Sequence, residues 1–328
     1  MFGNDAVRQE FLDRFPEIVA AVANAQLLES LAPMYTVDAA SDASTRMLEG
    51  NWQRDGSGLE AIIERFVRPV HLVQEGTFRS SPDGFPESEE VAKVLEGGRA
   101  QVETALPGVG RIDLRNHRLA WVGTGWVVAP EIVVTNRHVA DQIAAAHASG
   151  FAFRRTAGGR RVHASLDWLR EYGNPEESRF RVTEVVWMEP DASLDVALLR
   201  ISPTGEDGEA APAPIALMTE PAAVGDWVAV TGYPSHDSRA DLEDQQRIFD
   251  GIYNHKRLAA GRITALERDE LVHHDATTLI GNSGSALVHL ASGKAAALHF
   301  DGLADERNRA VSATALARIV QRHAAGTT

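Results

Sequence analysis

The segment TTLIGNSGSALV, residues 277–288, places the polar residues Gly281, Asn282, Ser283 and Gly284 between two apolar runs. Gly, Asn and Ser are the usual residues of tight turns, so the segment taken alone predicts an ordinary turn. A serine on such a turn can also act as a nucleophile if a base lies within reach. Other parts of the sequence must decide between an inert turn and a catalytic site.

Two upstream segments supply residues with the required chemistry. The stretch GTGWVVAPEIVVTNRHVA contains two strand-like runs and then His138, and the stretch ASLDVALLRI places Asp195 directly before an apolar run. A histidine at a strand end is usually a surface or packing residue. A half-buried carboxylate, however, is costly without a partner, so Asp195 needs a donor. We expect His138 to be that donor.

Taken in this order, His138, Asp195 and Ser283 supply a base, a carboxylate that orients the base, and a hydroxyl nucleophile. A neutral imidazole can accept the serine proton, while the carboxylate fixes the tautomer and stabilises the imidazolium. Glycines on both sides of Ser283 permit a sharp turn, which aims the N–H groups of Gly281 and Ser283 at one point as an oxyanion hole. A tight turn at residues 281–284 would then be compatible with both interpretations, the ordinary turn and the catalytic site.

Three alternatives compete with this interpretation. Asp191 lies four residues before Asp195, but it precedes Ala-Ser rather than an apolar run, which suits a solvated turn. The sequence His273-His274-Asp275 suggests a metal site, yet adjacent strand residues point to opposite faces, so we expect no metal there. An α/β-hydrolase would need the order serine, acid, histidine, which the residues after Ser283 do not fit.

The pattern of apolar and turn residues after Pro107 predicts a mainly β fold. Short apolar runs such as RIDL, WVGTGWVV and KAAALHF alternate with turn residues, a pattern typical of antiparallel barrels or sandwiches. Residues 313–324 are apolar at helical spacing and predict a C-terminal helix packed on the barrel.

The first part of the chain differs in character. Apolar residues at helical spacing predict a small helical region over residues 1–75, and we expect residues 76–102 to form a linker with a short helix. The linker is placed at SSPDGFPESEE, where prolines, a glycine and acids leave little to bury. Residues 103–328 would form the remaining domain.

Composition narrows the classes of function. The chain has 328 residues, a net charge of −14 and no cysteine, so neither a disulfide nor a thiol nucleophile can form. The acidic balance argues against a nucleic-acid partner, and we expect the cluster Arg154, Arg155, Arg160 and Arg161 to be a solvated loop rather than a binding patch. Without a signal peptide or an apolar span, a cytoplasmic protein with no membrane association is expected.

The segments GTGWVV with TNRHV, LDVALLRI and GNSGSALV resemble, in this order, the three signature blocks of trypsin-like serine proteases of the chymotrypsin fold. The residues in these segments are most similar to those of the bacterial branch that includes the glutamyl endopeptidases. The resemblance covers about residues 103–325. It implies two six-stranded β-barrels with the triad between them, hydrolysis of peptide bonds through an acyl-enzyme, and no cofactor. His138, Asp195 and Ser283 match the family's base, acid and nucleophile.

The resemblance also bears on substrate binding and activation. Thr278 and His299 match the residues with which glutamyl endopeptidases hold an acidic side chain, although a histidine there suits a neutral pocket as well. The residues Phe300, Asp301 and Gly302 would pair with the substrate backbone, and Asp301 places a negative charge where that family has glycine. Asn282 cannot form the ion pair by which digestive members activate, so no cleavage of that kind is expected.

We therefore predict a serine endopeptidase acting on polypeptides. The alternative is a latent or catalytically silent protease-like binding module. Decayed copies of such enzymes normally lose a triad residue, and all three are present here, which favours catalysis. As a hypothesis, residues 1–75 control access to the protease or bind a regulatory protein partner.

Overall fold

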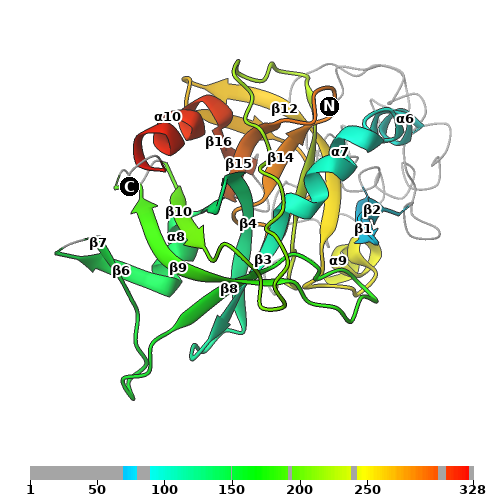
Figure 1. Ribbon diagram of the computed structural model, residues 1–328. Coiled ribbons are helices and arrows are strands. Elements are labelled where there is room, and N and C mark those ends of the chain that lie inside the picture. Colours follow the sequence, from blue (N-terminus) through cyan, green and yellow to red (C-terminus); the bar gives the residue numbers. More distant parts are fainter. Residues whose placement is uncertain are drawn as a thin grey trace, which may run out of the picture.

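The computed structural model describes residues 69–79, 89–148, 150–190, 194–237, 242–301 and 308–324. Within these residues the fold is mainly β, with two closed six-stranded barrels side by side and few helices (Figure 1). The prediction of a chymotrypsin-like double barrel with a C-terminal helix is confirmed. The helical region predicted for residues 1–75 lies almost wholly outside the described residues.

The first barrel closes through antiparallel strands in the order β10-β5-β4-β3-β8-β9. Their bounds are β3 (Val109–Arg115), β4 (Trp121–Ala129), β5 (Ile132–Thr135), β8 (His163–Asp167), β9 (Arg179–Met188) and β10 (Ala197–Ile201). Strands β4, β5 and β10 read as continuous apolar runs because both of their faces are covered. Val127 packs inside this barrel, whereas its neighbours Trp126 and Val128 pack toward the second barrel.

The second barrel has the order β11-β14-β15-β16-β13-β12 and closes through the pairing of β11 with β12. Its strands are β11 (Trp227–Gly232), β12 (Arg257–Glu267), β13 (Leu271–His274), β14 (Ala286–His289), β15 (Ala295–Asp301) and β16 (Asn308–Ser312). Two further strands, β1 (Val70–Gln74) and β2 (Thr77–Phe78), extend its sheet, because β1 pairs with β12.

Two short helices connect β2 to strand β3 of the first barrel. Helices α6 (Glu89–Gly97) and α7 (Arg99–Ala105) lead into a 3-10 turn, Leu106–Gly108. One apolar cluster combines residues of this N-terminal segment with residues of the barrel; its buried members include Val73, Phe78, Val91, Leu95, Val102, Ala229, Leu258 and Leu290. Residues 70–108 therefore pack on the second barrel, and the expected division at residues 75 and 102 stays a prediction.

The remaining elements are helices α8 (Arg137–Ile143), α9 (Leu242–Phe249) and α10 (Ala313–His323) and the hairpin β6 (Ala144–His147) and β7 (Gly150–Phe153). Ser312 caps α10 by accepting a hydrogen bond from the Ala315 N–H. Among the described residues, no helix combines the length and apolar character that a membrane crossing requires.

One apolar cluster lies between the two barrels. It unites Trp126, Val134 and Leu198 of the first barrel with Val288 and Leu298 of the second. All five of these side chains are fully buried. This shared core fixes the first barrel against the strands that flank residues 277–288, so it positions the candidate site.

Candidate active site

The segment around Ser283 forms two successive tight turns. The Asn282 N–H donates to the Leu279 carbonyl over 3.1 Å, and the Ser285 N–H donates to the Asn282 carbonyl over 2.8 Å. Gly281 and Gly284 occupy the third position of these turns with φ values of +93° and +89°. A type II turn has a positive φ at its third residue but not at its second, and this conformation favours glycine. The predicted turn is present, and it holds Ser283 between its two halves.

The backbone N–H groups that were predicted to form an oxyanion hole have no acceptor among the described residues. Within the described residues, neither the Gly281 N–H nor the Ser283 N–H donates to another backbone group, and the Ser283 hydroxyl makes no hydrogen bond. Ser283 is partly exposed, while Gly281 and Gly284 are buried. Two unused donors beside an accessible hydroxyl can together stabilise a developing oxyanion.

His138 and Asp195 meet as the sequence predicted, although His138 lies in the first turn of α8 rather than at a strand end. Its ring nitrogen Nδ1 is 2.5 Å from Oδ2 of Asp195, and its backbone N–H donates to Oδ1 over 3.0 Å. An ionised carboxylate can only accept, so Nδ1 carries a proton, and in the neutral imidazole Nε2 then keeps its lone pair. The side chain of His138 is 52% exposed, whereas that of Asp195 is 16% exposed.

Asp195 is further held through its main chain. The Asn136 side-chain amide donates to the Asp195 carbonyl over 2.9 Å. Asn136 is fully buried and stands in extended conformation directly before α8. Because Asn136 precedes the helix that carries His138, the base and its carboxylate are positioned by the same short segment. Asp191, the competing acid, falls outside the described residues.

Gly123 on β4 shows how closely the histidine and serine segments approach each other. A Cβ atom at Gly123 would lie 2.9 Å from Cγ2 of Val139 and 3.0 Å from the Ser283 carbonyl oxygen. Val139 follows His138, so one glycine of the first barrel separates the two segments. Any larger residue there would push them apart, which gives the first glycine of the GTG sequence a physical purpose.

Thr124 links the barrels at the site, a role that the sequence analysis did not assign. Its hydroxyl donates to the Gly281 carbonyl over 2.8 Å, and its backbone N–H donates to the Ser283 carbonyl over 2.9 Å. The same hydroxyl accepts from the Tyr233 N–H at 3.2 Å. Its position between the two glycines of GTG was the available signal, because a polar residue inside a buried strand must find partners.

The two expected substrate-binding side chains, Thr278 and His299, each form a hydrogen bond with a different residue. The Thr278 hydroxyl donates to Oδ1 of Asn308 over 2.8 Å, and the Asn308 amide donates to the Ala276 carbonyl over 2.6 Å. His299 on β15 instead contacts His274, with Nδ1 of His299 at 3.1 Å from Nε2 of His274. No hydrogen bond among the described residues joins Thr278 to His299, and their shared role in holding a substrate side chain stays a prediction.

His299 is neutral at physiological pH. Burial lowers the pKa of His299 to about 4; the charge of Asp301 acts in the opposite direction, and that of His138 lowers the pKa further. A neutral imidazole offers one donor and one acceptor, and one of its nitrogens faces His274. His299 can therefore present a hydrogen bond to a substrate but no charge.

The edge segment after His299 is only partly described. Phe300 packs against the core between the barrels, and the guanidinium carbon of Arg309 lies 5.4 Å from the centre of its ring. Asp301 forms an ion pair with Arg309. The negative charge expected beside the substrate strand is thus neutralised by its neighbour on β16. Gly302 lies outside the described residues.

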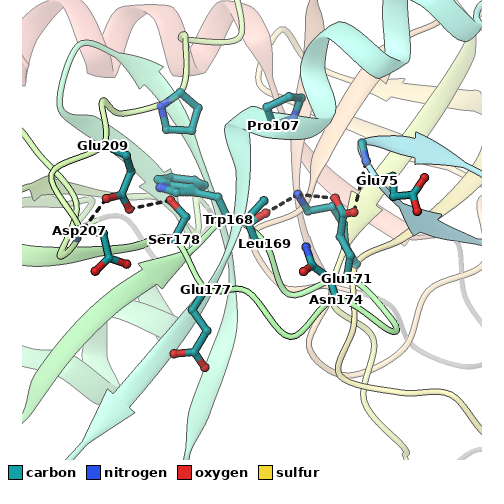
Figure 2. Close-up of a pocket in the computed structure, with 13 residues that line it drawn as sticks. Glu75, Pro107, Trp168, Leu169, Glu171, Asn174, Glu177, Ser178, Asp207 and Glu209 are labelled. Atoms are coloured by element: carbon teal, nitrogen blue, oxygen red, sulfur yellow. Dashed lines mark hydrogen bonds and ion pairs between the residues drawn. The ribbon is translucent and has the colours of Figure 1, made fainter.

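Two other features were considered as sites. His274 faces His299, while Nε2 of His273 lies 3.4 Å from Glu267, so the adjacent histidines diverge as expected for a strand. Among the described residues, no group of three or more metal-ligating side chains gathers. A cavity of about 490 Å³ opens beside Trp168, Leu169 and Glu171 (Figure 2), and none of the candidate site residues lines it.

This fold and site place the chain in a defined class. Residues 123–298, more than half of the chain, match the family described as the trypsin-like peptidase domain. The chain belongs to this family. The match begins at Gly123 and ends at Leu298, so it contains the three segments that carry His138, Asp195 and Ser283.

Solved structures of proteases resemble the chain in fold. The active form of the Rv3671c protease from M. tuberculosis is 21% identical, with a TM-score of 0.47, covering 78% of this chain and 93% of that one. The serine endoprotease from Yersinia pestis is 20% identical, with a TM-score of 0.44, covering 68% of this chain and 64% of that one. The comparison with curated proteins gives no match.

Proposed function

We propose that this chain is a serine endopeptidase in which Ser283 attacks the peptide carbonyl, His138 accepts its proton and Asp195 orients His138. The observation that carries the proposal is the 2.5 Å contact between Nδ1 of His138 and Asp195, which leaves Nε2 available as the base. Family membership supports the reaction class. A polypeptide is therefore the substrate class.

The chemistry follows from the groups at the site. Proton transfer from Ser283 to Nε2 of His138 accompanies attack on the substrate carbonyl, and the charged imidazole is stabilised by Asp195. The N–H groups of Gly281 and Ser283 would hold the oxyanion. The leaving amine then takes the proton from His138, and a water molecule repeats the sequence to release the acyl group.

A fluorophosphonate probe tests this proposal, because it reacts only with an activated serine. Stoichiometric labelling detected by intact mass, and lost in Ser283→Ala, supports an active serine hydrolase. Hydrolysis of a peptide library then identifies the endopeptidase. Unlabelled protein that is folded by circular dichroism would favour the alternative, a silent binding module.

A finer proposal concerns the residue on the amino side of the scissile bond, for which we infer a preference for Glu or Asp. The similarity of Thr278 and His299 to the glutamyl endopeptidases supports it, and so does Arg309, which neutralises the charge of Asp301. The neutral state of His299 limits the gain to hydrogen bonding. Library cleavage after Glu or Asp supports the preference, whereas cleavage mainly after aliphatic residues contradicts it.

We propose in addition that the region over residues 1–75 regulates the protease or binds a protein partner. Helical periodicity in the sequence supports this role, because an apolar helix face packs against another surface, either of this chain or of a partner. Residues 1–68 can be removed without touching β1. Equal rates of peptide hydrolysis and equal partner binding with and without residues 1–68 would contradict the proposal.

A further inference from the structure

Two stretches of the first barrel contain no acidic residue although the chain is strongly acidic. With 46 Asp and Glu among 328 residues, one residue in seven is acidic on average. Residues 114–130 and residues 142–166 nevertheless contain none, and they contain six arginines. These are Arg115, Arg118, Arg154, Arg155, Arg160 and Arg161, called the arginine surface below. The distribution of charge along the chain is therefore uneven.

The fold joins the two stretches into one surface. Arg115 on β3 lies opposite His163 on β8, and the Asn116 side chain donates to the Arg161 carbonyl over 2.9 Å. Arg155 and Arg161 face each other across an isolated β-bridge. The connection from β3 to β4 thus packs against the connection from β7 to β8. All six arginines are exposed.

The arginine surface differs in its partners from several other arginines of the chain. Elsewhere Arg99, Arg170 and Arg179 each pair with carboxylates. Among the described residues, no carboxylate forms an ion pair with any of the six arginines of the arginine surface. Some of their guanidinium groups are held in place instead. Nη1 of Arg155 donates to the Gly159 carbonyl over 2.8 Å, and Arg161 lies 4.0 Å from the ring centre of Phe153.

This surface adjoins the candidate catalytic helix. The Arg154 N–H donates to the Ile143 carbonyl over 2.8 Å, and its guanidinium donates to the Asp141 carbonyl, both in α8. Ile143 lies about 8 Å along the helix from His138, at the rise of an α-helix. Arg154 therefore joins the arginine surface to the helix that carries His138, and a polypeptide bound at His138 need extend only along this helix to meet it.

We propose that the arginine surface binds an acidic segment of the polypeptide substrate and so directs such substrates to the catalytic site. This inference deepens the proposed peptidase function and rests on it. Guanidinium groups pair with carboxylates in bidentate fashion, and unpaired cations beside a cleft accelerate the encounter with oppositely charged partners. Leu119, which is 42% exposed between Arg118 and β4, adds an apolar contact.

The charge of the whole chain favours a short acidic peptide over a nucleic acid. A peptide segment contacts the arginine surface alone, whereas a long polyanion would extend beyond it along a protein with a net charge of −14. The sequence favoured a solvated loop for Arg154, Arg155, Arg160 and Arg161. These residues do form a connection between strands, and the proposal gives that connection a ligand.

Binding is measured first, with full-length Ser283→Ala protein so that nothing is cleaved. The probe is a fluorescent peptide rich in Asp and Glu, compared with the same peptide carrying Asn and Gln. We expect the acidic peptide to bind at least about tenfold more tightly at low salt, with the difference shrinking as ionic strength rises. Equal binding of the two peptides overturns the proposal.

Two charge-reversal variants locate the binding. Arg118→Glu with Arg160→Glu changes two exposed residues whose side chains make no hydrogen bond among the described residues, so the fold should persist. The control, Arg318→Glu with Arg322→Glu, makes the same change in net charge on exposed residues of α10. We expect about a tenfold loss of affinity in the first variant only. An equal loss in both, or tighter binding of a single-stranded oligonucleotide than of the peptide, overturns the proposal.

Kinetics then connect binding with catalysis. One cleavable peptide is extended by an acidic or by a neutral tail, and kcat/KM is compared in active protein. We expect the acidic tail to raise kcat/KM about tenfold, and we expect Arg118→Glu with Arg160→Glu to remove that gain while leaving the neutral substrate unchanged. Failure of the probe labelling would contradict the peptidase function, whereas intact labelling without a tail effect contradicts only the docking surface.

Discussion

At the scale of single residues, the carboxylate of Asp195 is attached to His138 at two points, through the ring and through the backbone N–H. The backbone bond fixes where the carboxylate lies, and the ring bond fixes which imidazole nitrogen is protonated. These two functions can be separated by substitution, because an amide keeps the shape of the side chain and loses its charge.

Asp195→Asn should leave the fold intact and lower kcat by roughly 10³-fold or more, since the amide no longer selects the tautomer with a free Nε2. The rate of fluorophosphonate labelling should fall in parallel. Thermal unfolding provides the control: a melting temperature close to that of the wild type attributes the loss to catalysis. Unchanged turnover in the folded variant would exclude Asp195 as the orienting acid.

A second prediction concerns His299. Because burial lowers its pKa to about 4 in the folded chain, the unfolded chain binds this proton at higher pH than the folded chain does. The free energy of unfolding should therefore fall as the pH drops from about 6.5 to about 4, by roughly 3 kcal/mol from this group.

Urea denaturation at several pH values measures this effect. His299→Gln removes the ionisable ring and should flatten the pH dependence between these limits. His147→Gln, which replaces an exposed histidine on β6, should retain the wild-type slope. An unchanged slope in His299→Gln would contradict the assignment.

The role of a residue could be predicted from sequence where its chemistry required a partner from a distant segment. The half-buried Asp195 required a donor, and the contact with His138 confirms that inference. The partner of His299 could not be predicted, because the pairing of β13 with β16 and of β16 with β15 decides that His274 approaches it. Thr124 was overlooked for the same reason, since its partners lie on the other barrel.

At the scale of elements, the two type II turns around Ser283 each depend on glycine for two physical reasons. Both glycines have positive φ, but their surroundings also exclude a side chain. A Cβ atom at Gly284 would lie 2.0 Å from the Thr124 carbonyl oxygen and 2.7 Å from Oγ1 of Thr135. The turn is therefore pressed against β4 and β5, and its conformation is fixed by that contact.

Gly284→Ala should consequently abolish probe labelling and lower stability by several kcal/mol, since both the backbone and its neighbours must shift. Gly208→Ala is the matched control. Gly208 has a φ of +86°, but a Cβ atom there would meet nothing within 4 Å. The control should lose about 1 kcal/mol and keep its activity. Similar losses in the two variants would show that strain at φ, rather than the close approach to β4, governs the turn.

Elements were predictable from sequence where apolar runs were long and uninterrupted, as in β4, β10 and α10. Short or half-exposed strands such as β6 and β7 were not predicted, because their patterns contain too few apolar residues to stand out. Helix α8 was read as the end of a strand. Its seven residues are too few for a helical period to show, and packing of Val139, Ala140 and Ile143 stabilises it.

At the scale of the whole molecule, the N-terminal segment packs on the second barrel and extends its sheet. Strand β1 pairs with β12, and Val73, Phe78, Val91, Leu95 and Val102 pack against that barrel. Fully burying such side chains contributes about 1.5–3 kcal/mol each. Together they account for roughly 10 kcal/mol, comparable with the total stability of an average domain.

Deletion of residues 1–68 should therefore leave a cooperative fold, whereas deletion of residues 1–102 should give an aggregating or partly unfolded protein. Urea denaturation and gel filtration of the two shortened chains test this. If residues 103–328 fold as stably as residues 69–328, the packing of β1, α6 and α7 contributes little. In that case the predicted boundary at residue 103 would be the correct one.

The three hydrogen bonds that join Thr124 to Gly281, Ser283 and Tyr233 have a consequence for regulation. The base and its acid belong to one barrel and the nucleophile to the other, and this single threonine fastens the nucleophile's turn to the opposite barrel through Gly281 and Ser283. A ligand that shifted one barrel slightly past the other would strain the hydrogen bonds from Thr124 to Gly281 and Ser283. A small displacement of this kind would switch the site off with no loss of folded structure.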